Sequence, residues 1–262
     1  MSIGKRLSGF LGWGRSQKTP GPTPDRLTYA VGDIHGRADL LERMISLIEE
    51  DRAGQPADVV FLGDYIDRGA NSASVLQRLR TLDLPEADIH CLMGNHERML
   101  LDFLENPIAE GPRWLGNGGL ETLSSFIGPD WRPQAGRAYE TGYRDRLLEV
   151  AEPELFSWLR DLPLQWRSGD LGCVHAIADP LVAWDAQSEA TLLWGRPQPR
   201  MPKRKDGIWI AHGHTVVSRA SVQKERIALD TGAYQTGLLS AARFDQGRIA
   251  IFTTTPDSTV QE

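Results

Sequence analysis

Three polar clusters follow strand-like segments at a regular interval, and this limits the possible folds more than any other feature of the chain. Asp33, Asp64 and Asn95 belong to successive clusters and lie 31 residues apart. One strand, one helix and the turns between them occupy about that length of chain. The interval therefore predicts βαβ units with right-handed crossovers, a largely parallel sheet and an α/β fold.

Hydrophobic periodicity places the elements of this first half. Strand-like segments are expected at 27–31, 58–62 and 89–93, and apolar side chains recur at helical spacing within 40–48, 75–79 and 99–104. The second of these helices is expected to begin at Asn71 or Ser72, because both residue types cap helix N-termini well.

The second half of the chain has a different pattern. A helical region is expected from about 143 to 159. Short strand candidates then follow closely at 170–174, 207–211, 226–230, 237–244 and 248–254. Such close spacing favours hairpins and a mixed or antiparallel sheet.

Composition excludes several classes of protein. The 262 residues are 40% hydrophobic, and no apolar run approaches the ~18 residues that a membrane-spanning helix needs. A formal net charge of −6 has the wrong sign for a protein that neutralises a nucleic-acid backbone, so nucleic acid is not an expected partner. Cys91 and Cys173 form neither a disulfide framework nor a four-cysteine zinc site. A reducing, cytoplasmic location is the simplest expectation.

Residues 1–26 differ from the rest, because they are basic and rich in glycine and proline. This composition is typical of a tail and linker, which leaves 27–262 as a single catalytic domain. A mobile terminus is the simpler interpretation of the tail. The alternative is a short amphipathic helix within residues 1–15 that touches an anionic membrane surface.

The polar clusters at the strand ends carry the chemistry. They read Gly-Asp-Ile-His-Gly at 32–36, Gly-Asp-Tyr-Ile-Asp-Arg-Gly at 63–69 and Gly-Asn-His-Glu at 94–97. The carboxyl ends of parallel strands share one edge of a sheet, where open α/β sheets bind ligands. His175 and His214, each just after a strand candidate, can join the same place.

Carboxylate, carboxamide and imidazole groups gathered together suit divalent transition ions, and imidazole argues against an all-oxygen magnesium site. If one aspartate bridges, the site holds two metals. Paired metals stabilise both the attacking and the leaving oxygen in an in-line displacement at phosphorus. The clusters therefore predict a dinuclear phosphoester-cleaving centre.

These motifs resemble the PPP-type metallophosphatases of the calcineurin-like metallophosphoesterase superfamily. Within that family the chain is most similar to the bacterial and bacteriophage lambda-type serine/threonine protein phosphatases, through the motifs at 114–119, 193–196 and 230–233. The resemblance implies a β-sandwich of two mixed sheets flanked by helices and built on a βαβαβ core.

The resemblance also implies a ligand set. Asp33 and His35 would bind the first metal with Asp64, which would bridge to the second. The second metal's remaining ligands would be Asn95, His175 and His214. Manganese is the first choice of metal, with iron, zinc or nickel as alternatives.

The implied catalytic groups are four. His96 would be the general acid that protonates the leaving oxygen, and Asp67 would orient its ring. Arg68 and Arg196 would bind the phosphoryl oxygens, because the planar guanidinium group matches the geometry of phosphate. Asn95 would also contact these oxygens. A water activated by the two metals would be the nucleophile.

The sequence departs from the family pattern after His175, where Ala176 begins the next segment instead of a glycine pair, and after Arg196, where Pro197 begins a proline-rich stretch. His90 and His212 are interpreted as structural.

Three functions remain open: a serine/threonine, tyrosine or dual-specificity protein phosphatase acting on a phosphorylated protein or peptide, a hydrolase of diadenosine tetraphosphate or another small molecule, and a non-catalytic phosphate-binding module. Glu97 favours the first, since the related dinucleotide hydrolases more often have Asp there. Arg200, Lys203, Arg204 and Lys205 could form a basic rim that attracts phosphorylated or acidic peptides, or simply a solvated loop.

Overall fold

A parallel three-stranded unit forms the centre of the protein in a computed structural model, which describes residues 20–133 and 138–254. The strands are β1 (Leu27–Val31), β2 (Ala57–Phe61) and β3 (Ala87–Cys91). β2 pairs in parallel with both neighbours, so that Leu27, Ala57 and Ala87 share one register position. The predicted βαβ units are confirmed.

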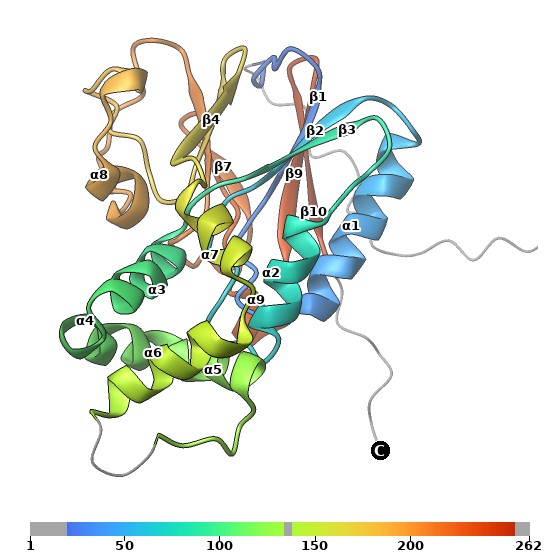
Figure 1. Ribbon diagram of the computed structural model, residues 1–262. Coiled ribbons are helices and arrows are strands. Elements are labelled where there is room, and N and C mark those ends of the chain that lie inside the picture. Colours follow the sequence, from blue (N-terminus) through green and yellow to red (C-terminus); the bar gives the residue numbers. More distant parts are fainter. Residues whose placement is uncertain (1–19, 134–137, 255–262) are drawn as a thin grey trace, which may run out of the picture.

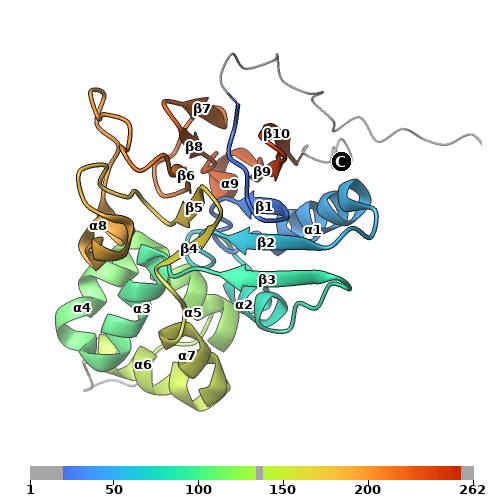
Figure 2. The ribbon, with the colours of Figure 1, turned by 90° about the horizontal axis from the view of Figure 1, so that it is seen from above.

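Two helices cover one face of this sheet (Figures 1 and 2). They are α1 (Ala38–Arg52) and α2 (Ser72–Arg80), and α2 begins where the sequence places it. Tyr29 and Val59, which point to this face, belong to the same buried cluster as Leu41 and Val75 of the helices. Alternate strand residues thus bury one face of the sheet against helices, as a period of two requires.

A second sheet packs on the opposite face. Its strands run in the order β4 (Gln165–Ser168), β5 (Leu171–Val174), β6 (Trp209–His212), β8 (Arg226–Ala228) and β7 (Ser221–Gln223). Ala30 and Val60 of the first sheet share a buried cluster with Cys173, Ala211 and Ile227 of the second. The molecule is therefore a sandwich of two sheets with helices outside, as expected.

The last two strands return to the first sheet. They are β9 (Ser240–Asp245), which is antiparallel to β1, and β10 (Arg248–Thr253), so that the sheet has the order β10-β9-β1-β2-β3. Both sheets are mixed. The short strands β4 and β7 were not predicted, because each contains a single hydrophobic residue, Trp166 or Val222, which leaves no alternation to detect.

A group of helices lies between β3 and β4 in the sequence, and most of it gathers at the lower left of Figure 1. They are α3 (Asn95–Glu105), α4 (Pro107–Trp114), the kinked turn η1 (Leu115–Gly119), α5 (Leu120–Ile127), α6 (Tyr139–Val150) and α7 (Pro153–Arg160). The region expected at 143–159 is two helices, because Pro153 occupies the first turn of α7 and cannot continue α6.

Short helices complete the second half. They are the 3₁₀ turn η2 (Trp184–Ala186), α8 (Glu189–Trp194) and α9 (Ala233–Thr236). Within 20–133 and 138–254, no helix combines the length and the apolar character needed to cross a bilayer.

The start of the chain differs in part from the expected linker. Gly21 donates its backbone N–H to Gly247 at 2.7 Å, and Asp25 donates its own to Ser168 Oγ at 2.9 Å, so residues 20–26 pack on the domain. The possible membrane-contacting segment, 1–15, lies outside the described residues.

Candidate metal centre

The first two strand-end loops are bonded to each other by their backbones. The N–H groups of Ile34 and His35 both donate to the carbonyl of Asp64, at 3.1 and 2.9 Å. The loops approach closely where Gly69 lies: a Cβ there would be 2.1 Å from the carbonyl oxygen of His35. A glycine is therefore required for the two loops to present their side chains side by side.

Left-handed backbone conformations occur at several residues of these two loops and in the loop after β6. Positive φ angles between 47° and 71° occur at His35, Asp64, Asp67, Arg68 and His214. Non-glycine residues seldom adopt this region, and each one has to be held there by its surroundings. Five predicted site residues therefore have a strained backbone conformation. The surrounding fold must stabilise this conformation, which sets the direction of their side chains.

Glu97 stabilises the Asp64 loop by hydrogen bonds to its backbone. Its buried carboxylate accepts the N–H groups of Asp64 and Tyr65 at 2.8 Å, of Gly94 at 3.1 Å and of Ile66 at 3.3 Å. Burial, followed by the charge of Asp64, raises the pKa of Glu97 to about 8. The hydrogen bonds of Glu97 are to the protein backbone. The structure therefore shows no contact through which Glu97 would favour a protein substrate over a dinucleotide.

Replacing Glu97 by alanine is expected to destabilise the protein by about 3 kcal/mol or more, because several buried N–H groups would lose their acceptor. Urea unfolding followed by circular dichroism measures this loss. Glu50→Ala, at an exposed position of α1, is the matched control and should change stability by less than about 0.5 kcal/mol. Equal stability of the two variants would contradict the assigned role.

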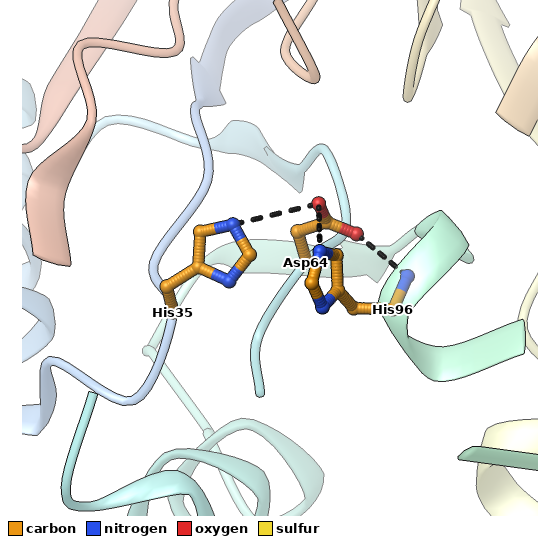
Figure 3. Close-up of side chains that lie close together, drawn as sticks. All are labelled: His35, Asp64 and His96. Carbon is orange, nitrogen blue, oxygen red and sulfur yellow. Dashed lines mark hydrogen bonds and ion pairs between the residues drawn. The ribbon is translucent and has the colours of Figure 1, made fainter. Parts of the chain in front are cut away.

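Two triplets of ligand-type side chains meet at Asp64. His35, Asp64 and His96 form one, and Asp64, His175 and His214 the other; within each, the ligand atoms lie within 4.8 Å of one another. Figure 3 shows the rings of His35 and His96 next to the Asp64 carboxylate, with their Nε2 atoms 3.6 and 3.9 Å from the same oxygen, Oδ2. The other carboxylate oxygen of Asp64, Oδ1, lies 3.4 Å from His175 Nε2.

Backbone carbonyls fix which nitrogen of two histidines is free. His35 Nδ1 donates to Ile66 O at 2.7 Å, and His175 Nδ1 donates to Leu62 O at 2.9 Å. Burial lowers the pKa of His35 to about 3 and also lowers the pKa of His175. Both rings are therefore neutral at neutral pH, and each directs an Nε2 lone pair into the centre, which is the arrangement a metal ligand needs.

Asn95 brings a further acceptor to the second triplet. Its Oδ1 lies 2.8 Å from His175 Nε2 and 2.8 Å from His214 Nδ1. In neutral His175 this nitrogen has no proton, since Nδ1 carries it, so two lone pairs face each other. A cation between them would resolve this, and the mixed oxygen and nitrogen donors fit a divalent transition ion.

Buried negative charge supports the same fit. Asp33, Asp64 and Asp230 are each at most 2% exposed. Burial, followed by the charges of Asp230 and Asp64, raises the pKa of Asp33 well above its ordinary value. Carboxylates packed together without a cation repel one another, and divalent ions are the usual compensation.

Asp33 itself lies at the edge of this arrangement. Its carboxylate accepts the backbone N–H of His214, at 3.0 and 3.2 Å to the two oxygens. It belongs to neither triplet. The close approach needs Gly213, because a Cβ there would lie 1.9 Å from Asp33 Oδ1.

His96, a member of the first triplet, forms a buried pair with Asp67. His96 Nδ1 donates to Asp67 Oδ2 at 2.6 Å. Burial lowers the pKa of His96, but the charge of Asp64 and the hydrogen bond to Asp67 more than offset it, so the pKa lies above 6.5. Asp67 is held in turn by Trp114 Nε1 at 3.0 Å and Thr122 Oγ1 at 2.6 Å.

The two arginines have different surroundings. Arg68 Nη1 lies 3.2 Å from His35 Nε2, Arg68 Nη2 lies 3.1 Å from His96 Nε2, and its Cζ lies 4.9 Å from the ring centroid of Tyr234. Arg196 is exposed at the rim. It is still near enough to act on the site, since burial, then His175 and more weakly Arg196, lower the pKa of His214 to about 4.

Sequence reasoning placed none of three residues at this centre: Trp114, interpreted as a core or cleft-lining tryptophan, Asp230 and Tyr234. The first two lie in motifs that the sequence marks, at 114–119 and 230–233. A tryptophan whose N–H needs a buried acceptor is a usable signal for Trp114. Tyr234 has no comparable signal, because only folding brings its ring to Arg68.

The residues interpreted as structural behave so. His90, on β3, has its Nε2 2.8 Å from Oδ1 of Asp58 on the neighbouring strand β2. His212 is buried, and burial lowers its pKa to about 4. The basic run is only partly a rim, because Arg204 is 9% exposed and Lys203 bonds to Glu225 at 2.6 Å.

Known proteins are similar to this chain in sequence and in fold. The model of the calcineurin-like phosphoesterase family matches residues 27–218. The symmetrical bis(5'-nucleosyl)-tetraphosphatase of Paracidovorax citrulli strain AAC00-1 is 27% identical, over 82% of this chain and 91% of that protein. Serine/threonine-protein phosphatase 1 of Salmonella typhimurium strain LT2 is 31% identical, over 83% of this chain and 92% of that protein.

Solved structures extend the likeness in fold. A structure of a cold-active protein tyrosine phosphatase has a TM-score of 0.56 and 19% identity, covering 88% of this chain and 81% of that one. At this identity the likeness concerns the fold alone.

Proposed function

The chain belongs to the calcineurin-like phosphoesterases, and from that premise we propose that it is a protein phosphatase that hydrolyses phosphoserine and phosphothreonine. The observation that carries the proposal is the meeting of two triplets of ligand-type side chains at Asp64, one of which includes His96, the residue bonded to Asp67. Such a site can hold cations, bind a phosphoryl group and deliver a proton.

We assign six residues to two divalent cations. Asp33, His35 and Asp64 would hold one cation, and Asp64 would share the other with Asn95, His175 and His214. Manganese is the first choice for this donor set, with iron, zinc or nickel as alternatives. Two such cations would supply positive charge for the phosphoryl oxygens and make water a stronger nucleophile.

His96 would act as the general acid. Its Nδ1 is committed to Asp67, so its Nε2 is the atom left to hand a proton to the leaving oxygen of the substrate. Asp67 keeps the ring in this orientation, and Trp114 and Thr122 keep Asp67 in place. The pair is thus positioned before a substrate arrives.

Arg68 and Arg196 would bind the phosphoryl oxygens, together with Asn95. Arg68 has its guanidinium within hydrogen-bond distance of both His35 and His96, which puts it beside the point where a phosphoryl group would react. Arg196, at the rim, would meet the substrate from the solvent side.

Hydrolysis of dinucleoside tetraphosphates is the second candidate, because relatives such as the Paracidovorax citrulli protein carry that name. A substrate panel separates the two functions: phosphoserine, phosphothreonine and phosphotyrosine peptides and diadenosine tetraphosphate, each with Mn²⁺. We expect the highest kcat/KM on a phosphoserine or phosphothreonine peptide. Higher values on the dinucleotide would favour the second candidate, and inactivity on all four with metal bound would refute both.

A further inference from the structure

An apolar pocket of about 570 Å³ lies next to the candidate metal centre. Its size is that of a small-ligand site. Its lining mixes apolar and polar side chains, and the apolar ones include Ile177, Pro180, Leu181, Trp194, Met201 and Pro202; we call it the Trp194 pocket.

The Trp194 pocket is continuous with the metal centre. The ring centroid of Trp194, at the end of α8 (Figure 1), lies 6.5 Å from that of His214. Ile177 follows His175 by two residues. The two walls are packed together, since a Cβ on Gly195 would lie 2.4 Å from Ile177 Cγ1. A substrate held by its phosphoryl group at the metal centre therefore has this pocket within reach.

One wall is a loop that two buried or half-buried side chains hold in place. Gln187 Nε2 donates to the carbonyls of Asp179 at 3.0 Å and Val182 at 2.9 Å. Arg204 Nη1 and Nη2 donate to the same two carbonyls, at 2.7 and 3.1 Å. Arg204 is itself fixed by Asp206 at 2.5 Å. The pocket is therefore preformed, and binding there would not have to order the loop.

This fixed loop presents a leucine to solvent. Leu181 is 77% exposed, and its N–H donates to Asp179 Oδ1 at 2.8 Å. A lone exposed leucine is ordinary. Here, however, four hydrogen bonds from Gln187 and Arg204 hold the loop that carries it beside a reaction centre, which is the geometry of a contact residue for a ligand.

The charged residues at the rim of the Trp194 pocket limit which ligands it can bind. Arg196 and Arg200 are exposed there, so they favour an anionic substrate, while the apolar wall excludes a phosphoryl group. A nucleobase would find little to stack on, because Trp194 is the one aromatic residue among the described residues of the lining and its ring already has the guanidinium of Arg113 4.3 Å from its centroid. An aliphatic side chain on an anionic polypeptide fits both features.

Resting on the function proposed above, we propose that the Trp194 pocket receives an apolar side chain that lies close in sequence to the phosphorylated residue of a polypeptide substrate. The phosphoryl group would occupy the metal centre, and the neighbouring apolar side chain would bury itself against Leu181 and Trp194. The site would then select phosphorylated segments by an adjacent hydrophobic residue.

Phosphothreonine peptides that differ only in one residue beside the phosphothreonine, leucine or serine, placed on either side, test the proposal. Wild-type protein with Mn²⁺ is expected to show about tenfold higher kcat/KM on one leucine peptide than on its serine counterpart. Leu181→Ser should remove most of this preference and leave kcat/KM on p-nitrophenyl phosphate unchanged. Leu148→Ser, the same change at an exposed leucine of α6, should keep the preference.

Several outcomes would overturn the proposal: equal kcat/KM on leucine and serine peptides in wild type, a preference that survives Leu181→Ser, or a loss in Leu181→Ser confined to diadenosine tetraphosphate, which would make the occupant a base. Failure of the proposed function is recognised separately, as inactivity on p-nitrophenyl phosphate. In that event fluorescence anisotropy with labelled peptides still decides, because the leucine peptide should bind about tenfold more tightly than the serine peptide to wild type and not to Leu181→Ser.

Discussion

Replacing His96 by asparagine is expected to lower kcat by about a hundredfold to ten-thousandfold while metal content stays the same. The reason is geometric: Asp67 fixes Nδ1 at 2.6 Å, so the opposite nitrogen is the one positioned to protonate a leaving oxygen. Asparagine preserves polarity and approximate size but cannot serve as an acid near neutral pH. Steady-state kinetics together with elemental analysis of the purified protein measure both quantities.

The size of this loss should depend on the leaving group. A phenoxide such as p-nitrophenoxide departs without a proton more readily than the alkoxide of serine, so His96→Asn should harm p-nitrophenyl phosphate hydrolysis less than phosphoserine hydrolysis. Equal losses on both substrates would indicate that His96 acts by holding the site together and not by donating a proton.

His90→Asn provides a matched control. His90 is also a histidine bonded to an aspartate, with Nε2 2.8 Å from Asp58 Oδ1, but it lies on β3, in the strand itself and not in a strand-end loop. The same substitution there should leave kcat within about twofold, because nothing in its surroundings reaches a substrate. A large loss at His90 would mean that activity reports general stability and not the acid.

The part of the fold that could be predicted is the part where sequence neighbours become spatial neighbours. β1, β2 and β3 pair in the order in which they occur, with helices between them, so spacing and periodicity were sufficient. β9 and β10 could be recognised as strands. Their place beside β1 could not, because that pairing joins segments about two hundred residues apart and leaves no local pattern.

The candidate site divides in the same way. Side chains that end strands, such as Asp64 and His175, were identified because strand ends meet at a sheet edge. The residues that support Asp67 were not, since Trp114 and Thr122 reach its carboxylate from 47 and 55 residues away. Arg204 shows the opposite error: a residue expected at a solvated rim is buried, because two carbonyls and Asp206 give its guanidinium partners.

Replacing Asp64 by asparagine should have the largest effect on metal binding. Asp64 is the residue common to both triplets, so one change removes charge from both proposed cation positions. Metal content should fall clearly below that of wild type, and kcat/KM should fall by about a thousandfold or more, because several kcal/mol of transition-state stabilisation depend on the cations. Elemental analysis and calorimetric titration with Mn²⁺ measure the first effect.

Asp58→Asn is the control for Asp64→Asn. It shows whether the loss of metal content is specific to Asp64 or follows from removing any buried carboxylate. Asp58 is 6% exposed and is bonded to Arg26 and His90, within the strand β2 and outside both triplets. It should lower stability while leaving metal content intact, because its oxygens face cationic and imidazole partners that belong to the sheet. If Asp64→Asn kept the metal content and activity of wild type, Asp64 could not be the shared ligand. The two triplets would then be neighbours by packing alone, and the residues that hold cations would have to be sought elsewhere.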